Sequence, residues 1–262
     1  SMALARVLPR VQYAVRREGS RFAIALTPTV SCKTFWGFVR HDQREFIRVM
    51  REILHITEQN LGCRNYHLRV MPFTGAPTPA KRGQLSTPLE EGDALMPFVK
   101  AAGFYVCVFG DNERKGEPAE AEGLSELDAK IDYVDKSGKR VTLPVTNRDL
   151  TVFDGETARV CLDAQGRPVL VVVFKRFVRL QSECSDEEVL QLWTLALQAV
   201  QERTGWVDDD LFQDIRLNAG TFQNVSHLHL KVWMNPGKFR ECWKGHAGYE
   251  ALSNWLNKSG QT

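Results

Sequence analysis

The chain has 262 residues, of which 43% are hydrophobic and 25% charged, and its net charge is +2. These values are typical of a globular protein with a full core and exclude a disordered or fibrous chain. The near-neutral charge gives no argument for binding nucleic acid or a membrane surface. No apolar run approaches the roughly 20 residues that span a bilayer. The six cysteines contain no CxxC pair, which indicates neither a disulfide framework nor a structural zinc site and favours a reducing compartment.

The segment 1–21 is basic. Up to Arg17 it holds four arginines and no acid, interleaved with apolar residues such as Val7, Val11 and Tyr13. This composition suits a mitochondrial targeting segment, and it equally suits a basic arm that packs on the fold. We therefore expect a cytoplasmic protein, with a mitochondrial location as the alternative.

The region 22–145 alternates strand and helix signals and is expected to form an N-terminal α+β region. One helix begins at Asp42, an N-cap with Glu45 at the capping-box position, and ends at Gly62. Another helix is expected over 89–103. Strands are expected at 22–30, 34–39, 66–71 and 104–109, a loop at 74–83, and a hairpin at 131–134 and 140–143 around the turn 136–138.

The region 146–262 is expected to form a second domain. An amphipathic helix covers 186–204 and ends at Gly205, and a shorter helix covers 249–256. Strands are expected at 149–153, 158–163, 168–175, 212–217 and 225–233. The fold class that follows is α+β, an antiparallel sheet with helices on one side.

The last of these strands carries the strongest functional signal. In Gln223–Val232, period-two alternation places His227, His229 and Lys231 on one face and leucine and valine residues on the other. Such a strand buries one face and offers imidazoles to a ligand on the other. The same pattern also fits an ordinary polar strand face or half of a metal site.

The residues around this strand favour a particular family. A hydrophobic strand, Pro168–Val178, runs into basic residues, Ser185–Glu188 starts a helix, and Leu217–Gly220 holds Asn218. In this order, together with His227-Leu-His229-Leu-Lys231, the segment 149–240 resembles the histidine-triad (HIT) superfamily of nucleotide hydrolases and transferases. The resemblance implies a nucleotide ligand, a phosphoanhydride or phosphoramidate substrate, and no cofactor or metal.

The resemblance also implies residue roles. His229, the middle position of the triad, is expected to attack phosphorus and form a nucleotidyl-histidine, with a carbonyl from 218–220 fixing its tautomer. His227 is expected to be structural. Asn218, Gln223 and Asn224 are expected to donate to the phosphate. Asp163 is either the ribose-binding acid or a simple turn residue.

Two positions depart from the family pattern. Lys231 stands where the third histidine is expected, and Phe222 where close relatives have glycine. We expect the Lys231 ammonium to bind phosphate without acting as a general acid, unless burial or a cationic neighbour lowers its pKa. The alternative is a surface lysine and a HIT-fold binding or scaffold protein without turnover.

The strand–helix–strand order recurs in 34–71 and 169–217, and Gly37-Phe-Val-Arg40 echoes Arg176-Phe-Val-Arg179. One hypothesis is an internal duplication, in which the N-terminal half is a degenerate HIT-like repeat without the histidine strand, His67 being its nearest counterpart. The chain would then act as a homodimer or an internal pseudo-dimer. The acidic run 208–210 is interpreted as a solvated turn.

Overall fold

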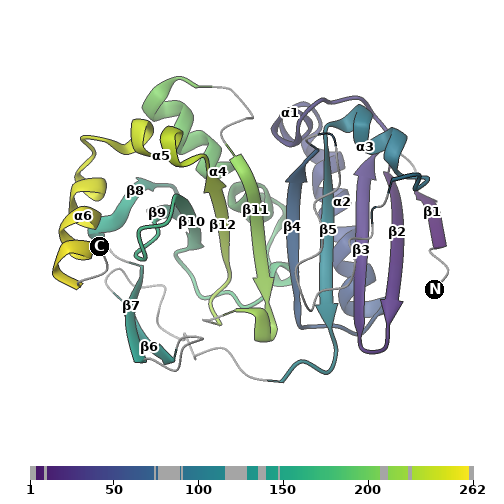
Figure 1. Cartoon of the computed structure of the whole chain (residues 1–262), viewed down its shortest axis with the longest axis horizontal. Helices are drawn as coiled ribbons and strands as arrows, with labels where there is room; N and C mark the ends of the chain where they lie inside the picture. Colours follow the sequence, from purple (N-terminus) through teal and green to yellow (C-terminus); the bar gives the residue numbers. More distant parts are fainter. Residues whose placement is uncertain are drawn as a thin grey trace. The chain divides into compact units, whose positions relative to one another are not determined.

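The computed structural model describes residues 4–8, 11–73, 75, 89, 91–115, 129–134, 140–146, 148–206, 212–223 and 226–259. The chain divides into two compact units (Figure 1): Ser1–Gly116 with Asn218–Phe222, and Glu117–Leu217 with Gln223–Thr262. Each unit is α+β with an antiparallel sheet, as expected. The predicted loop at 74–83 apart from Gly75, the hairpin turn 136–138, the acidic run 208–210 and Asn224 lie outside the described residues.

The N-terminal unit holds five strands in the order β1-β2-β3-β5-β4, and every neighbouring pair is antiparallel. Val11 and Ala14, from the basic segment 1–21, are buried in this sheet. That segment therefore contributes two strands to the unit. The strands are β1 (Leu4–Leu8), β2 (Val11–Glu18), β3 (Arg21–Pro28), β4 (Tyr66–Pro72) and β5 (Phe104–Asp111).

Helices α1 (Phe35–His41) and α2 (Gln43–Leu54) connect β3 to β4, and a π-helical segment, His55–Asn60, extends α2. The strand predicted at 34–39 is wrong. The Thr34 side chain accepts from the backbone N–H of Gly37 at 3.0 Å and so caps α1. Phe35 and Phe38 then lie on one side of the helix, where both rings contact Phe104. Capping and this packing outweigh the β preference of the aromatic residues.

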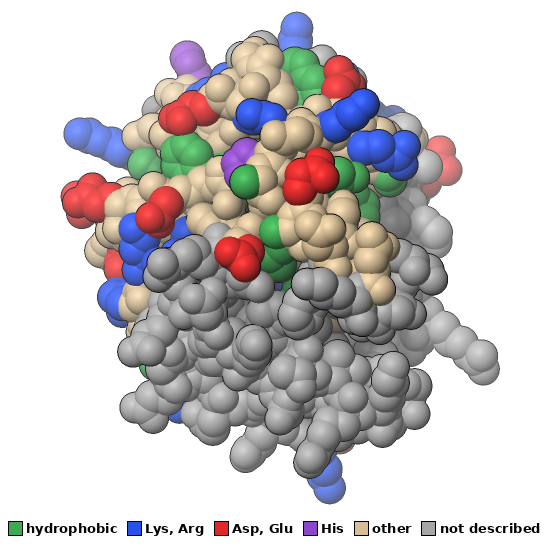
Figure 2. Space-filling model, turned by 90° about the vertical axis from the view of Figure 1, so that its left-hand side faces the viewer, with side chains coloured by type: hydrophobic (Ala, Val, Ile, Leu, Met, Phe, Trp, Pro, Cys, Tyr) green, Lys and Arg blue, Asp and Glu red, His purple; other side chains and the backbone are tan. Residues whose placement is uncertain are grey.

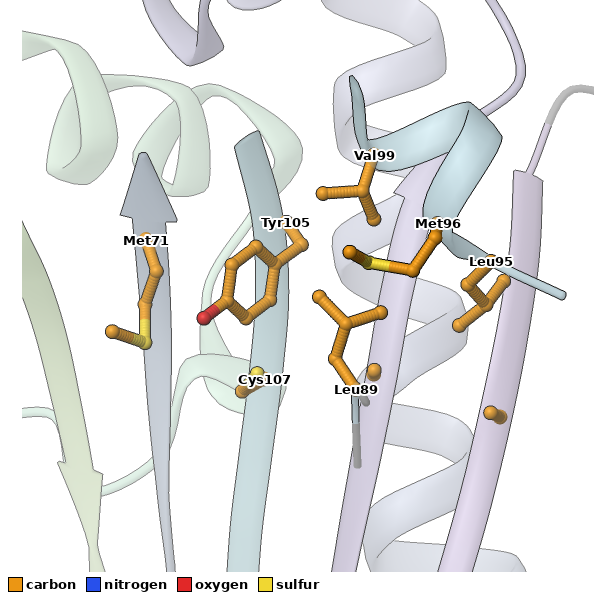
Figure 3. Packing of buried hydrophobic residues seen from close by; sticks show 9 residues of the cluster. Met71, Leu89, Leu95, Met96, Val99, Tyr105 and Cys107 are labelled. Atoms are coloured by element: carbon orange, nitrogen blue, oxygen red, sulfur yellow. The ribbon is translucent and has the colours of Figure 1, made fainter. Parts of the chain in front are cut away.

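An apolar cluster covers the opposite face of the same sheet (Figure 3). It is formed by α3 (Met96–Ala102), which contacts β3 and β5, and by residues that precede it. The helix predicted over 89–103 is therefore much shorter, because Gly92 takes a positive φ and Pro97 lies in the first turn. The buried members of the cluster are Ala14, Ala25, Met71, Leu89, Leu95, Met96, Val99, Tyr105 and Cys107.

The main sheet of the C-terminal unit has, among the described residues, the strand order β8-β9-β10-β12-β11, again antiparallel. The long helix α4 (Asp186–Thr204) packs on β9, β10 and β12, and its Ser185–Glu188 capping box confirms the predicted start. The predicted hairpin is also confirmed, as β6 (Ala129–Val134) and β7 (Arg140–Thr146). The remaining elements are β8 (Thr151–Asp154), β9 (Ala158–Leu162), β10 (Val169–Phe174), β11 (Phe212–Ala219), β12 (His229–Met234), α5 (Pro236–Trp243) and α6 (Ala247–Ser259).

The two units repeat one topology. In each, three strands form a meander, a helical segment follows, and the fifth strand pairs between the third and the fourth. This arrangement agrees with the duplication hypothesis, with one correction. The counterpart of the histidine strand β12 is present as β5, which contains no histidine. His67 lies instead on β4, the counterpart of β11.

Among the described residues, no helix is long and apolar enough to cross a membrane. On the face shown in Figure 2, basic and acidic side chains of the described residues are interspersed.

Candidate active site

The strand β12 divides its side chains between two environments. Leu230, Val232 and Met234 are buried on the side that packs against α4, whereas His229, Lys231 and Trp233 are half-buried on the other side. The strand is shorter than predicted, because residues 226–227 form a bend before it. The expectation that His227 belongs to the same strand face is therefore wrong, while the placement of His229 and Lys231 together is confirmed.

His227 is fully buried and bound at both ring nitrogens. Its Nε2 donates to the Phe174 carbonyl at 3.0 Å, and its Nδ1 accepts from the Val178 backbone N–H at 3.4 Å. Burial lowers its pKa, so the ring is held neutral in one tautomer. The Phe177 ring stacks on it at 5.6 Å between centroids and 15° between planes. His227 thus joins the end of β10 to the start of β12.

His229, unlike His227, has a described hydrogen-bond partner at one ring nitrogen and not at both. Its Nδ1 donates to the backbone carbonyl of His227 at 2.9 Å, which leaves Nε2 as the nitrogen with a lone pair. No described residue hydrogen-bonds Nε2. The acceptor is not the predicted carbonyl of 218–220, because the bend at 226–227 turns the His227 carbonyl toward the ring. Burial, followed by the charge of Lys231, lowers the pKa of His229 to about 3, so the ring is neutral at pH 7.

Lys231 lies among cations. In the sheet it pairs with Arg216 on β11 and with Val171 on β10. Burial, followed by the charges of Arg167 and Arg216 and against the opposing effect of Asp163, lowers the pKa of Lys231 to about 8. The condition under which Lys231 could act as an acid, a pKa lowered by burial and by cationic neighbours, is therefore met. Near pH 8 this ammonium can both bind an anion and release a proton.

The two arginines are held by carboxylates and by an indole. Arg167 binds both oxygens of Asp163, at 2.6 and 3.0 Å, and Arg216 Nε donates to Asp214 at 2.7 Å. The Trp233 ring centroid lies 5.3 Å from the Arg167 guanidinium carbon and 5.5 Å from that of Arg216. These cation–π contacts fix both guanidiniums beside Lys231.

The other predicted residues are placed as follows. Asp163 is buried, bound to Arg167, and its carbonyl closes a turn by accepting from the Gly166 N–H at 2.9 Å. Gln223 is 6% exposed, and its Nε2 has no hydrogen-bond partner among the described residues. Asn218 is half-buried on β11, in the segment that groups with the N-terminal unit.

Phe222 belongs to the same segment as Asn218. Its ring lies 4.9 Å from that of His67, and the Arg114 guanidinium lies over it at 4.1 Å. The side chain that replaces the expected glycine is thus packed within the N-terminal unit.

Sequence reasoning missed Arg167, Arg216 and Trp233. The signal for Trp233 was available, because period two from Lys231 places it on the same face; Arg216 is brought opposite Lys231 by the pairing of β11 with β12. That pairing requires the register of β11 against β12, which alternation alone does not supply. Arg167 lies in the β9–β10 turn, where no periodic pattern applies.

No family model and no curated protein matches the chain. Solved structures similar to it include a GalT-like protein from Arabidopsis thaliana, at 8% identity and TM-score 0.48, covering 86% of this chain and 74% of that one. A DUF4931 family protein from Bacillus cereus has 10% identity and TM-score 0.46, over 96% and 97%. A uridylyltransferase has 9% identity and TM-score 0.41, over 90% and 75%. Values this low assign the chain to no family.

Proposed function

We propose that the protein is a nucleotide hydrolase or nucleotidyltransferase in which His229 attacks phosphorus and carries the nucleotidyl group. The observation that carries this proposal is the state of the His229 ring. Its Nδ1–H is bound to the His227 carbonyl and its pKa is about 3, so Nε2 holds an unprotonated lone pair at neutral pH. The resemblance of the surrounding sequence to the histidine-triad superfamily supplies the reaction class.

The proposed step is a nucleophilic substitution at phosphorus. The Nε2 lone pair forms an N–P bond with the phosphoryl group of the nucleotide, and the bond from phosphorus to the leaving group breaks with its electron pair. The positive charge that develops on the ring is stabilised through Nδ1–H by the His227 carbonyl. Water or another acceptor then attacks phosphorus, and Nε2 leaves with the N–P electron pair, which restores the neutral ring.

Lys231 would serve this step in two ways. Its ammonium, two residues from His229 on the same strand face, neutralises charge on the phosphoryl oxygens. With a pKa of about 8 it also gives a proton to the leaving group and recovers one when the acceptor is deprotonated. Gln223 supports anion binding as a buried amide donor that lacks a partner among the described residues.

The test is the covalent intermediate. The protein is incubated with a panel of nucleoside di- and triphosphates, nucleotide sugars, dinucleoside polyphosphates and nucleoside phosphoramidates, and its intact mass is measured after an acid-free quench. We expect an added nucleoside monophosphate, mapped by peptide sequencing to His229, and lost in His229→Ala. His55→Ala is the matched control, because His55 is exposed on the π-helical segment.

Absence of the adduct across the panel, with tight nucleotide binding retained, would overturn the catalytic proposal. It would leave a nucleotide-binding protein of the same fold as the better description.

A further inference from the structure

Three cations converge on one side of β12, beyond His229. Lys231 and Arg216 are paired across β12 and β11, and both Arg216 and Arg167 lie over the Trp233 ring. Lys231 follows His229 by two residues, which is about 7 Å at roughly 3.3 Å per residue. The group of Arg167, Arg216 and Lys231, called here the cation triplet, therefore continues the proposed site along the strand.

Two described carboxylates bind members of the triplet. Asp163 binds Arg167, and Asp214 binds Arg216. No described carboxylate lies within 4.0 Å of the Lys231 ammonium. Among the described residues, Lys231 therefore has no carboxylate in direct contact. Arg216 donates only its Nε to Asp214 among the described residues, so its terminal N–H groups remain available.

Such crowding has an electrostatic cost. A half-buried ammonium near two guanidiniums loses hydration and is repelled by like charge, which is unfavourable unless an anion supplies the countercharge. The Arg216 guanidinium, whose terminal N–H groups bind no described residue, and the neighbouring Lys231 ammonium match the charge and hydrogen-bonding needs of phosphate. Binding of a polyanion would therefore relieve the like-charge repulsion that is present in the free protein.

We propose that the cation triplet is a subsite for the phosphate groups beyond the one that His229 attacks. The substrate class is then a phosphoanhydride, whose leaving group carries at least one phosphate, rather than a phosphoramidate with a neutral amine leaving group. The assignment of substrate class rests on the proposed function, whereas the subsite itself does not, because it binds phosphates whether or not His229 reacts.

The test uses inorganic tripolyphosphate and orthophosphate, which carry no base or sugar. Isothermal titration calorimetry at low salt and pH 7 should show tripolyphosphate binding at least tenfold more tightly than orthophosphate. Lys231→Met and Arg216→Gln should each weaken tripolyphosphate at least tenfold, while His229→Ala should retain it. Lys238→Met is the matched control, because Lys238 lies on α5 over Trp206.

Arg216→Gln removes the ion-pair partner of Asp214 and could fold poorly. Lys231→Met removes a charge but no described ion pair, so a thermal-shift measurement on this variant still tests the proposal. Tripolyphosphate should raise the Tm of the wild type and of the Lys238 variant but not that of Lys231→Met. Equal binding of the two anions, or equal losses in the Lys231 and Lys238 variants, overturns the subsite. Tripolyphosphate binding with no His229 adduct would instead keep the subsite and remove the catalytic proposal.

Discussion

The Nδ1–H of His229 donates to the backbone carbonyl of His227 at 2.9 Å, and this hydrogen bond gives the two histidines different roles. His227 uses both ring nitrogens to hold the bend before β12. Its carbonyl then fixes which nitrogen of His229 keeps the lone pair. His227 thus orients the ring of His229, and His229 keeps an unprotonated Nε2 for the reaction.

His227→Ala should destabilise the protein strongly. The change removes two buried ring hydrogen bonds and the stack on Phe177, and it leaves the Val178 N–H without its acceptor. We expect a loss of roughly 2–4 kcal/mol in the free energy of unfolding, measured by urea denaturation. His229→Ala, at the half-buried position two residues away, is the comparison. If both variants lose the same stability, the structural role assigned to His227 is wrong.

The pH dependence of turnover should follow Lys231 on its alkaline side. Its pKa of about 8 predicts that kcat/KM falls above pH 8. Because the pKa of His229 is about 3, no acidic fall is expected from that residue between pH 5 and 7.

Two variants of Lys231 distinguish its role as a proton donor from its role as a positive charge. Lys231→Arg keeps the charge but cannot release a proton, so kcat should fall at least tenfold with KM little changed and the alkaline fall abolished. Lys231→His should be tolerated and should move the alkaline fall to lower pH. A fall at pH 8 that persists in Lys231→Arg would assign it to another group.

Lys231→Met should stabilise the free protein at pH 7. The folded-state pKa of about 8 lies below the ordinary 10.5, so the unfolded chain binds the proton more readily between these values. The charged lysine therefore destabilises the fold fully below pH 8, and this penalty disappears as pH rises to 10.5. We expect Tm to rise by about 2–4 °C at pH 7, the shift given by about 1 kcal/mol in a chain of this size. The gain should vanish near pH 10.5 when the two proteins are scanned in parallel.

His229→Gln should reduce the loss of stability in acid. The folded-state pKa of about 3 lies below the ordinary 6.5, so the unfolded chain takes up this proton first as pH falls. The contribution is present above pH 6.5 and is lost progressively toward pH 3. A glutamine at this position carries no such penalty. The Tm difference between variant and wild type should therefore shift in favour of the variant from pH 6.5 to 4.5, and a constant difference would argue against the low pKa.

Local patterns predicted much of the fold. The capping box at Ser185 and the positive φ of Gly205 are set by nearby residues, so both ends of α4 were predictable. The register and order of the strands depend on distant pairing, and alternation does not contain this information. The helix at 35–41 was missed because a threonine cap and packing on Phe104 decided between two local preferences.

Only part of the candidate site could be predicted from the sequence. Alternation alone placed His229 and Lys231 on one face. The pKa of Lys231 was not predictable, because it depends first on burial and then on Arg167 and Arg216, which reach it through a turn and a cross-strand pair. The partner of His229 Nδ1 depended on a bend two residues earlier, which interrupted the predicted strand.

The shared topology of the two units has a consequence for how their sequences are free to change. In the N-terminal unit the connection between the fourth and fifth strands includes α3, which fills one sheet face with Leu95, Met96 and Val99. In the C-terminal unit the same connection carries His227. The same connection thus packs a sheet face in one unit and fixes the ring of His229 in the other. Substitutions in α3 that conserve volume should then drift without selection on chemistry, whereas the loop before β12 should not.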